Sequence, residues 1–395
     1  MDLRHTEGEQ AFRRELRAWL DRALPTLPPP PRRDDWAGRR AYDTRWQHML
    51  HEAGYAGIDW PPDAGGRGAS PVEHLIYLEE TARAGVPYVG VNFVGVLHAG
   101  PTLIAEGTPE QRRRHLPRIL SGEDVWCQGF SEPAAGSDLA ALRTAAVRDG
   151  DHYVVSGQKT WSSFAQVADY CELLVRTDPG APRHKGITWL IVPMDLPGIE
   201  IRPMRTLAGS AEFAELFLDD VRVPVGNRVG AENDGWRVAM VTLRFERGTA
   251  FAGDLISCLE LLRELAVLAR AQGTAWHDDA LRRELGRLHG ELAALWSLTK
   301  WNVSQSRARV PGVGGSVVKL RFSELRQRLF DAAAEVLGPA ALAVSDLDGL
   351  PNGRYVRERL SSLSYTIAAG SSQIQRNIIG ERILGLPREP DAAAR

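Results

Sequence analysis

The sequence predicts an α+β protein with an all-α N-terminal domain, a central β domain and a C-terminal helical bundle. Two changes of hydrophobic period give this order. The helical spacing of apolar residues gives way to short β-rich runs near Val125, and it returns after Gly235. At 395 residues, 44% of them hydrophobic, the chain is long enough for two or three domains. We place these domains at residues 1–123, 124–231 and 232–395.

The N-terminal part repeats apolar residues at helical spacing, as Leu16, Trp19 and Leu20 illustrate. A Pro-rich stretch at residues 27–31 interrupts this pattern and is typical of a rigid linker. A glycine-rich loop follows at residues 60–70. We therefore expect helices separated by loops in this domain.

The central part changes to short β-rich runs, with Pro and Gly between them every 10 to 20 residues. Such punctuation separates strands rather than helices. The pattern therefore predicts a β domain. The four runs are HYVVSG, CELLVRT, GITWLIVP and AEFAELFLDDVRVP.

Long amphipathic patterns return in the C-terminal part, and they are wide enough to bury more than one face of a helix. Helices of this kind predict a bundle that also packs against partner subunits. We therefore expect a homodimer or a homotetramer, with a heteromer as the alternative. The runs are LISCLELLRELAVLARA, LRRELGRLHGELAALWSL and KLRFSELRQRLFDAAAEVLG.

Composition excludes several classes of function. The net charge of −2, with no concentrated basic face, argues against nucleic acid as a partner. The N-terminus is charged, and no run of 18 apolar residues occurs, so we expect a cytoplasmic protein without a membrane span. Cys127, Cys171 and Cys258 lie far apart without CxxC spacing, which indicates a reducing compartment and no metal centre.

Two segments of the central part have the chemistry of a cofactor loop. In residues 131–138, SEPAAGSD, proline fixes φ, Gly136 permits a tight backbone, and serines offer hydroxyl and backbone donors to an anion. The tripeptide GSD alone is more typical of a plain surface turn. About 25 residues later, Trp161 follows a Gly-Gln-Lys-Thr turn and precedes two serines. An aromatic plane beside short hydroxyls suits a flavin ring.

Five segments, taken in order along the chain, resemble the acyl-CoA dehydrogenase family. They are LPRILSGEDVWCQGFSEPAAGSDLA, GQKTW, RTLAGSAEFAELFLDDVRVP, GAENDGW and GSSQIQRNIIGERILGLPR. The likeness spans nearly the whole chain. It implies an all-α N-terminal domain, a β-barrel-like central domain and a C-terminal four-helix bundle, with FAD as the cofactor.

The resemblance also implies site residues. In the family, the first segment contacts the flavin and its pyrophosphate, the second lines the isoalloxazine ring near N5, and the last adds FAD contacts. The FAD contacts in this sequence would be Phe130, Ser131, Gly136, Ser137, Trp161, Ser163, Ser371 and Gln373. The floor of the acyl pocket would draw on Val89, Asn92, Phe93 and Leu97. Phe93 either shortens that cavity or is ordinary helix core.

The family's reaction needs a carboxylate that removes the α-proton of an acyl thioester while the β-hydride leaves to flavin N5. Most members carry this base just before the glycine of the C-terminal motif, where this chain has Ala369. A minority carry it on a helix of the C-terminal domain, immediately before an arginine, and Glu246-Arg247 matches that pattern. We therefore predict that Glu246 is the base. The alternative is an ordinary solvated or salt-bridged pair.

Two departures from the family pattern concern the cofactor. Members usually carry an Arg-x-x-Phe-Gly segment that reaches the FAD pyrophosphate of a neighbouring subunit, whereas this region reads GTAWHDDALRRELGRL. Glu335 stands where many members have a glutamine near that pyrophosphate, and a carboxylate there would repel a diphosphate unless it points away. These departures fit either a variant loop or a subgroup that assembles as a heteromer.

The resemblance implies FAD-dependent α,β-dehydrogenation of an acyl-CoA, with electrons passing on to an electron-transfer flavoprotein. One alternative keeps the fold but uses a carrier-protein thioester, or lets the reduced flavin react with O₂. A second alternative is a non-catalytic subunit that stabilises a related active chain. Ala369 motivates that interpretation, and the complete flavin-contact set opposes it.

Overall fold

The computed structural model describes residues 4–86, 89–245, 251–307, 314–345 and 352–388. By the contacts between Cα atoms, the chain divides into two compact units. The helical unit consists of Met1–Arg17, Pro71–Val86 and Arg247–Arg395, and the sheet unit consists of Ala18–Ser70 and Pro87–Glu246.

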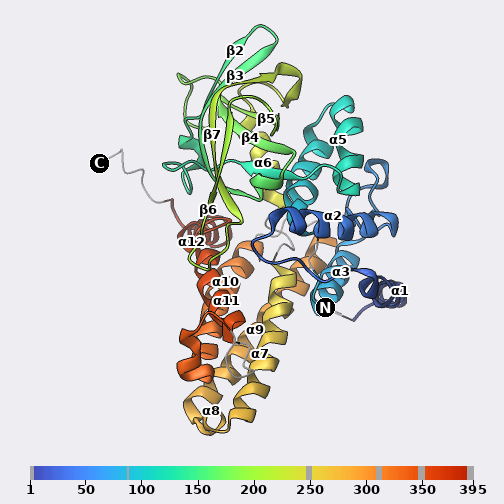
Figure 1. Ribbon diagram of the computed structural model, residues 1–395, viewed down its shortest axis with the longest axis vertical. Helices are drawn as coiled ribbons and strands as arrows, with labels where there is room; N and C mark the ends of the chain where they lie inside the picture. Colours follow the sequence, from blue (N-terminus) through green and yellow to red (C-terminus); the bar gives the residue numbers. More distant parts are fainter. Residues whose placement is uncertain (1–3, 87–88, 246–250, 308–313, 346–351, 389–395) are drawn as a thin grey trace. The chain divides into compact units, whose positions relative to one another are not determined.

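The prediction of a central β domain is confirmed. Within the described residues, eight strands form one sheet in the order β6-β7-β3-β2-β4-β5-β8, and β1 pairs in parallel with β4 (Figure 1). The four predicted β-rich runs form β3, β4, β5 and β7. The strands are β1 (Trp126–Gly129), β2 (Ala145–Asp149), β3 (His152–Ser163), β4 (Tyr170–Arg176), β5 (Ile187–Pro193), β6 (Ile199–Met204), β7 (Phe213–Pro224) and β8 (Arg228–Val229).

The long antiparallel pair β3 and β7 organises the sheet. Side chains in the first half of β7 alternate between more and less buried positions, as period-2 strands with one covered face do. By contrast, β4 and β5 are buried almost continuously. Tyr153, Val155, Leu216 and Val221 lie in the apolar core of the sheet, each at most 1% exposed. The β3–β7 register shifts twice, and the second shift falls between Lys159 and Ser162.

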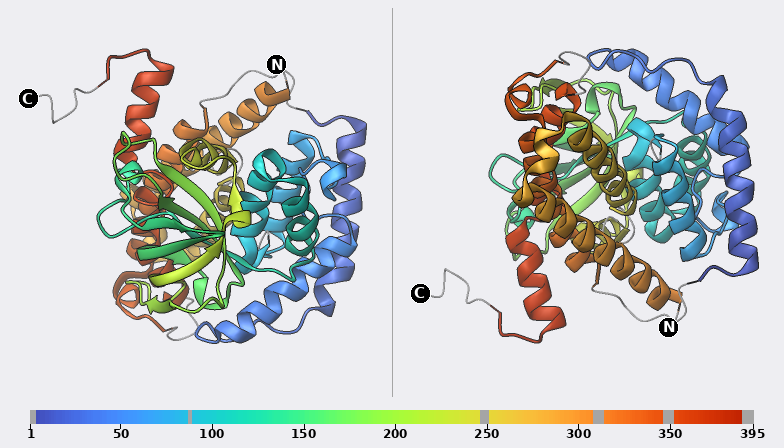
Figure 2. Two further views of the ribbon diagram at one scale, coloured as in Figure 1. Left: turned by 90° about the horizontal axis from the view of Figure 1, so that it is seen from above. Right: turned by 90° about the horizontal axis from the view of Figure 1, so that it is seen from below.

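Helices pack beside the strands within the sheet unit. They include α2 (Trp36–Glu52), α4 (Gly100–Glu106), α5 (Pro109–Ser121) and α6 (Gly235–Phe245). In Figure 2 the green strands gather in one layer next to the cyan helices α4 and α5. Helix α5 begins at a capping box formed by Thr108 and Gln111. Thr108 Oγ1 accepts from Gln111 N–H at 3.2 Å, Gln111 Oε1 accepts from Thr108 N–H at 3.0 Å, and a proline occupies the first turn.

The helical unit contains the predicted bundle. Its helices α7, α9, α10 and α11 pack against one another in pairs, with α10 in contact with the other three (Figure 1). Leu265, Leu288, Phe322 and Leu329 are completely buried in its core. The bounds are α1 (Glu7–Ala23, which continues into the sheet unit), α3 (Pro71–Arg83), α7 (Ala252–Gln272), α8 (Thr274–His277), α9 (Asp279–Arg307), α10 (Gly314–Leu337), α11 (Asn352–Ser362) and α12 (Ser372–Ile378).

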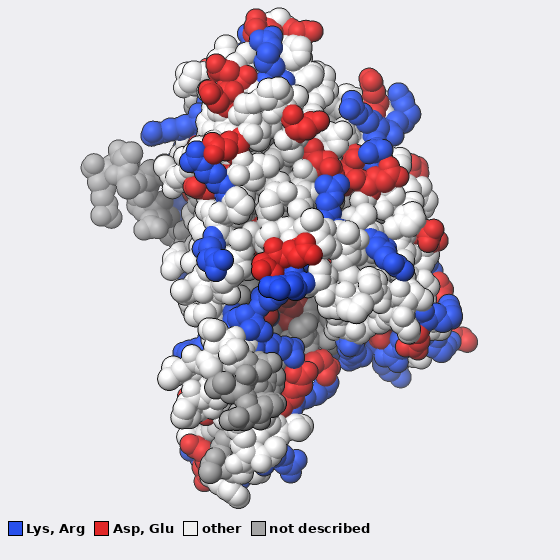
Figure 3. Space-filling view, viewed as in Figure 1, with Lys and Arg blue, Asp and Glu red and all other residues white. Residues whose placement is uncertain are grey.

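The distribution of charge on the surface matches the small net charge of the chain. On the face shown in Figure 3, acidic and basic side chains are interspersed and do not gather by sign. No helix in the described part of the chain is long and apolar enough to cross a membrane.

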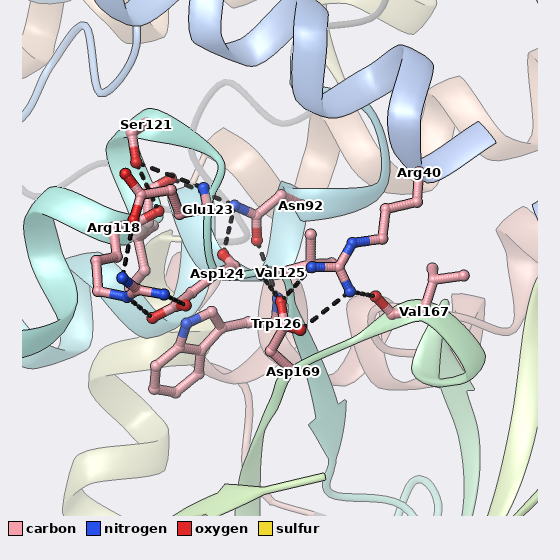
Figure 4. Close-up of polar contacts among 11 residues, drawn as sticks. Arg40, Asn92, Arg118, Ser121, Glu123, Asp124, Val125, Trp126, Val167 and Asp169 are labelled. Atoms are coloured by element: carbon pink, nitrogen blue, oxygen red, sulfur yellow. Dashed lines mark hydrogen bonds and ion pairs between the residues drawn. The ribbon is translucent and has the colours of Figure 1, made fainter. Parts of the chain in front are cut away.

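A polar junction fixes the segment before β1 (Figure 4). The side-chain amide of Asn92 donates to the carbonyls of Ile119 and Asp124 at 3.3 and 3.0 Å, and its Oδ1 accepts from Trp126 N–H at 3.0 Å. Asn92 is 1% exposed. Because buried backbone groups need partners, one side chain here satisfies three of them.

Arg40 and Asp169 complete the junction from the other side (Figure 4). The Arg40 guanidinium donates to both carboxylate oxygens of Asp169, at 3.0 and 2.7 Å, and to the carbonyl of Val167 at 2.7 Å. Asp169 Oδ2 also accepts from Val125 N–H at 2.8 Å. Helix α2, the start of β1 and the start of β4 are thereby tied together.

We expect Asn92→Ala to lower the free energy of unfolding by about 2–3 kcal/mol, because the buried Trp126 N–H and Asp124 carbonyl lose the partner that Asn92 supplies, whereas Ile119 O keeps the Gln47 amide. The measurement is urea unfolding followed by fluorescence. Asn227→Ala is the matched control, since half-buried Asn227 donates one hydrogen bond, to Ile191 O at 2.9 Å. Equal losses in the two variants would contradict the importance given to the junction.

Candidate active site

The two predicted cofactor segments meet in the sheet unit. Thr160 N–H donates to Ser131 O at 2.9 Å, so the start of the loop lies against the end of β3. Lys159 Nζ donates to Phe130 O at 3.2 Å and to Glu132 Oε1 at 2.8 Å. Residues about 30 positions apart are thus joined by direct hydrogen bonds. The two segments that the resemblance assigns to the flavin therefore lie together.

The Lys159–Glu132 ion pair is buried, since Lys159 is 0% and Glu132 8% exposed. Glu132 also accepts from the backbone N–H groups of Arg143 and Thr144, at 2.7 and 2.8 Å. Burial alone would raise the pKa of Glu132, but the Lys159 charge and these hydrogen bonds outweigh it and hold the pKa below its usual value. Glu132 is therefore a carboxylate at neutral pH.

Trp161 is held out from the sheet by its backbone. Its φ is +62°, in the left-handed region, and it lies at the register shift of β3. Its indole is 59% exposed and meets the Phe213 ring edge-on at 5.7 Å. A left-handed backbone conformation is costly for a bulky residue, and such strained residues cluster at ligand-binding and active sites. An exposed aromatic plane in this conformation fits the face of a flavin.

The hydroxyls beside Trp161 differ in environment. Ser162 is fully buried, and its Oγ has no hydrogen-bond partner within the described ranges. Ser163 is half-buried and precedes Phe164, which also has a left-handed φ of +55°. The Ser163 side chain is accessible to a ligand lying along Trp161, whereas that of Ser162 is not.

The loop tip is exposed and open. Glu132 and Ala135 exchange two backbone hydrogen bonds, of 3.1 and 3.0 Å, that close a tight turn and leave Gly136 and Ser137 exposed. Gly136 does not have a left-handed φ, so the backbone conformation of this loop does not require a glycine there. A Cβ added to it would meet no described atom within 4 Å. This open space beside backbone and hydroxyl donors fits a pyrophosphate.

The predicted pocket segment has irregular helical geometry. A 3₁₀ turn at Gly90–Asn92 is followed by a π-turn at Gly95–Ala99. Val89 and Asn92 are buried, whereas Phe93 and Leu97 are half-buried. The Asn92 amide is occupied by backbone partners, as described above.

Phe93 links the pocket segment to β3. Its ring meets that of Phe164 edge-on at 6.1 Å, and Phe164 directly follows Ser163. A predicted pocket residue therefore packs against the residue that follows a predicted flavin contact. Phe93 also meets His98 edge-on at 5.7 Å, which fixes the orientation of its ring.

Sequence reasoning missed a buried polar cluster under the pocket segment. Gln128 Nε2 donates to Glu172 Oε1 at 2.7 Å, and His98 Nδ1 lies 3.6 Å from the same oxygen. Gln128 and Glu172 are register partners on the parallel strands β1 and β4. The available signal was a glutamate inside the apolar run CELLVRT, where only a partnered carboxylate is tolerated.

The remaining predicted residues belong to the helical unit or lie outside the described residues. Ser371 is the N-cap of α12, where its Oγ accepts from Ile374 N–H at 3.3 Å, and Gln373 is exposed. Glu246 and Arg247 lie outside the described residues. In the ranges that are described, no three His, Cys, Asp or Glu side chains are placed to hold a metal ion.

The turn at Ala369 is held firmly although it carries no carboxylate. Ala369 has a left-handed φ of +52°. Lys319, 4% exposed, donates from Nζ to the carbonyls of Tyr365 and Gly370 at 2.8 and 2.7 Å. Gln375 Nε2 donates to Ala369 O at 3.1 Å. These bonds offset the strain of left-handed alanine.

Comparison with protein families gives matches along almost the whole chain. The N-terminal domain of acyl-CoA dehydrogenases matches residues 6–123, the middle domain matches residues 127–221, and the C-terminal domain matches residues 233–384.

Similarity to individual proteins and solved structures points to the same family. The chain is 42% identical to acyl-CoA dehydrogenase IpdE1 of Mycobacterium tuberculosis, covering 96% of this chain and 98% of the relative. It resembles two solved structures. One is the steroid ACAD Tcur3481-Tcur3483, with TM-score 0.85, 32% identity, and 98% of this chain and 100% of that chain covered. The other is the ChsE4-ChsE5 complex from Mycobacterium tuberculosis, with TM-score 0.83, 36% identity and the same coverage. These matches show that the chain belongs to the acyl-CoA dehydrogenase family of flavoprotein oxidoreductases, which act on the CH–CH bond of acyl-CoA.

Proposed function

We propose that this chain binds FAD and dehydrogenates an acyl-CoA between its α and β carbons. The observation that carries the proposal is the direct bonding of the SEPAAGSD loop to the strand end that presents exposed Trp161. When bound, FAD supplies the acceptor for the β-hydride at its N5. The chain must hold the cofactor, orient the thioester and take the α-proton.

Binding of FAD is assigned to residues with suitable exposure. Gly136 and Ser137 lie in an exposed loop that would take the pyrophosphate, while exposed Trp161 and half-buried Ser163 would face the ring system. Phe130 and Ser131 are connected to them through the buried Lys159–Glu132 pair. Ser371 and Gln373 complete the proposed set by resemblance to the family.

We expect Lys159→Met to weaken FAD binding by about tenfold or more, because breaking a buried ion pair leaves an uncompensated charge. The Glu132 carboxylate stays buried without its partner, and the loop is loosened from β3. The measurement is the dissociation constant of FAD from fluorescence titration of the apoprotein. Lys185→Met, which removes an exposed lysine of the same unit, is the matched control. An unchanged constant in a folded Lys159→Met variant would refute the positioning role.

Glu246 is proposed as the α-proton acceptor. The usual position for this base holds Ala369, whose turn is nevertheless kept in place by Lys319 and Gln375. An alanine cannot take a proton, so a productive site needs a carboxylate from elsewhere. Glu246, before Arg247, matches the alternative position within the family pattern.

We expect Glu246→Gln to bind FAD normally but to lose about 10²–10⁴-fold in the rate at which an acyl-CoA bleaches the flavin under anaerobic conditions, because no group accepts the α-proton. Ala369→Glu added to this variant restores part of the rate by returning a carboxylate to the usual position. Stopped-flow absorbance measures both rates. Bleaching by Glu246→Gln at the wild-type rate would rule Glu246 out.

The substrate class is proposed from a relative. One solved structure, 32% identical to this chain, is that of a steroid ACAD. We accordingly propose an acyl-CoA with a bulky ring system. Reoxidation by an electron-transfer flavoprotein stays a prediction, as do the carrier-protein and O₂ alternatives. Stoichiometric H₂O₂ formed with the enoyl product would identify O₂ as acceptor.

We also propose that the chain works in a hetero-oligomer with a related second chain, in place of the homo-oligomer expected from its helices. Two similar structures bear the names of protein pairs, Tcur3481-Tcur3483 and ChsE4-ChsE5, and the second is a complex. Glu335 supports this, because it is exposed on the last turn of α10 and would repel a diphosphate brought to it. The missing Arg-x-x-Phe-Gly segment supports it as well.

We expect the chain purified alone to bind clearly less than one FAD per chain at saturating FAD, since every copy in a homo-oligomer would bring its own Glu335 carboxylate to a diphosphate and repel it. Light scattering combined with the flavin-to-protein absorbance ratio measures this. A homotetramer with one tightly bound FAD per chain would contradict the hetero-oligomer. A chain that binds no FAD alone or with a related partner would favour the non-catalytic subunit.

A further inference from the structure

Two bulky residues at the end of β3 have left-handed backbone conformations. One is Trp161, and the other is Phe164, which has φ +55° and ψ 21° and precedes the 3₁₀ turn Ala165–Val167. Glycine adopts this conformation without steric cost, and asparagine visits it, whereas a residue with an aromatic side chain rarely does. The backbone alone therefore favours a smaller residue at position 164, and the contacts of the Phe164 ring have to compensate for the strain.

The ring of Phe164 lies between two segments that are distant in sequence. It packs against Trp36 of α2, with 5.9 Å between the ring centroids and 56° between the ring planes, and it meets Phe93 edge-on at 6.1 Å. Both separations are in the range of favourable aromatic pairs. All three side chains are half-buried and belong to the sheet unit. We call Trp36, Phe93 and Phe164 the Phe164 cluster.

Hydrogen bonds hold the backbone of the same turn. Phe164 N–H donates to Glu212 O at 2.7 Å, and its carbonyl accepts from Val167 N–H at 3.0 Å. Arg40 lies one helical turn after Trp36, on the same side of α2. It donates to Val167 O at 2.7 Å, and Figure 4 shows its side chain reaching from the helix to this carbonyl. Helix α2 therefore contacts the turn twice, through an aromatic pair and through a guanidinium.

These contacts hold Ser163 on both sides. Toward the N-terminus, Ser163 pairs with Phe213 of the antiparallel strand β7. Toward the C-terminus, it is followed directly by Phe164 with its hydrogen bonds and ring contacts. Ser163 is half-buried near exposed Trp161, so its side chain stays accessible to a ligand while its backbone is held.

A purely structural role explains less of this arrangement. An aromatic ring can pack from an ordinary strand position, where its backbone carries no strain. Here the strained Phe164 directly follows a predicted flavin contact, and strained residues cluster at ligand-binding and active sites. The conformation of Phe164 therefore points to a need for precise placement of the residue before it.

We propose that Phe164, held by its two ring contacts, is a positioning residue that fixes the Ser163 hydroxyl against the ring of bound FAD. This inference rests on the proposed function, in which Ser163 contacts FAD. Phe164 acts on the cofactor through Ser163. Hydrogen bonds to the ring nitrogens of a flavin tune its electronic properties, so the placement of this hydroxyl affects both FAD affinity and the visible absorption spectrum of the bound flavin.

A double-mutant cycle tests the proposal. The readouts are the dissociation constant of FAD, from fluorescence titration of the apoprotein, and the absorption maximum of the bound flavin. We expect Ser163→Ala to weaken FAD binding by about two- to tenfold, the range of one hydrogen bond. Phe164→Leu, which stays apolar but loses the ring, should weaken it by a similar factor and move the absorption maximum in the same direction. In the Ser163→Ala background, Phe164→Leu should add less than about twofold, because the two residues act as one unit.

Further variants keep the test independent of any one substitution. Trp36→Leu removes a ring contact from a different element and should act like Phe164→Leu, whereas Phe164→Tyr keeps the ring and should retain most of the wild-type affinity. Phe217→Leu is the matched control, because Phe217 is another half-buried aromatic residue, further along β7. Ser162→Ala controls for the loss of a hydroxyl, since Ser162 is fully buried. Both controls should bind FAD as the wild type does, and thermal unfolding verifies that each variant is folded.

The outcomes separate this proposal from the proposed function. The positioning role is overturned, and the proposed function stands, if Phe164→Leu weakens FAD binding by the same factor with and without Ser163, or leaves both readouts unchanged in a folded protein. Coupling of the two residues in a protein whose flavin no acyl-CoA bleaches would support the positioning role and count against the proposed reaction. A wild-type chain that binds no FAD would overturn both.

Discussion

The candidate site depends on one buried ion pair, Lys159–Glu132. It joins a loop that follows β1 to the end of β3, and it fixes both before any ligand is involved. Removing two charges from water is costly, so such a pair persists only when further bonds satisfy it. Here the Phe130 carbonyl and the Arg143 and Thr144 amides supply them. The same pair leaves Trp161 two residues beyond, where the register of β3 shifts. Order at the proposed flavin site is therefore a property of the sheet.

Much of the fold was predictable because its signals are local. Periodicity located the strands β3, β4, β5 and β7 and the long helices of the bundle, and proline and glycine marked their ends. The meeting of the SEPAAGSD loop with Trp161 was predicted only through the family resemblance, since no local rule pairs positions 30 residues apart. The structure supplied the physical cause, which is a lysine already present inside the GQKTW motif.

What sequence reasoning missed depends on long-range contacts or on backbone conformation. Gly136 was expected to matter for its backbone freedom, yet the structure shows open space beside it instead. Asn92 was expected in the acyl pocket, and its amide is found bonded to three backbone groups. The ring contact between Phe164 and Trp36 joins the end of β3 to α2, which no pattern within one element reveals. Glu246 lies outside the described residues, so its role stays a prediction.

The small number of lysines in this chain has a practical consequence. Of 48 basic residues only four are lysines, and two of these, Lys159 and Lys319, are almost completely buried. Each makes bonds to closely spaced oxygens that suit a compact ammonium group and would not accept a planar guanidinium. Among the lysine side chains, amine-directed reagents will therefore find exposed Lys185 first and half-buried Lys300 second in the native protein. Labels, cross-links and surface attachment through lysine can thus be directed to two known side chains without engineering.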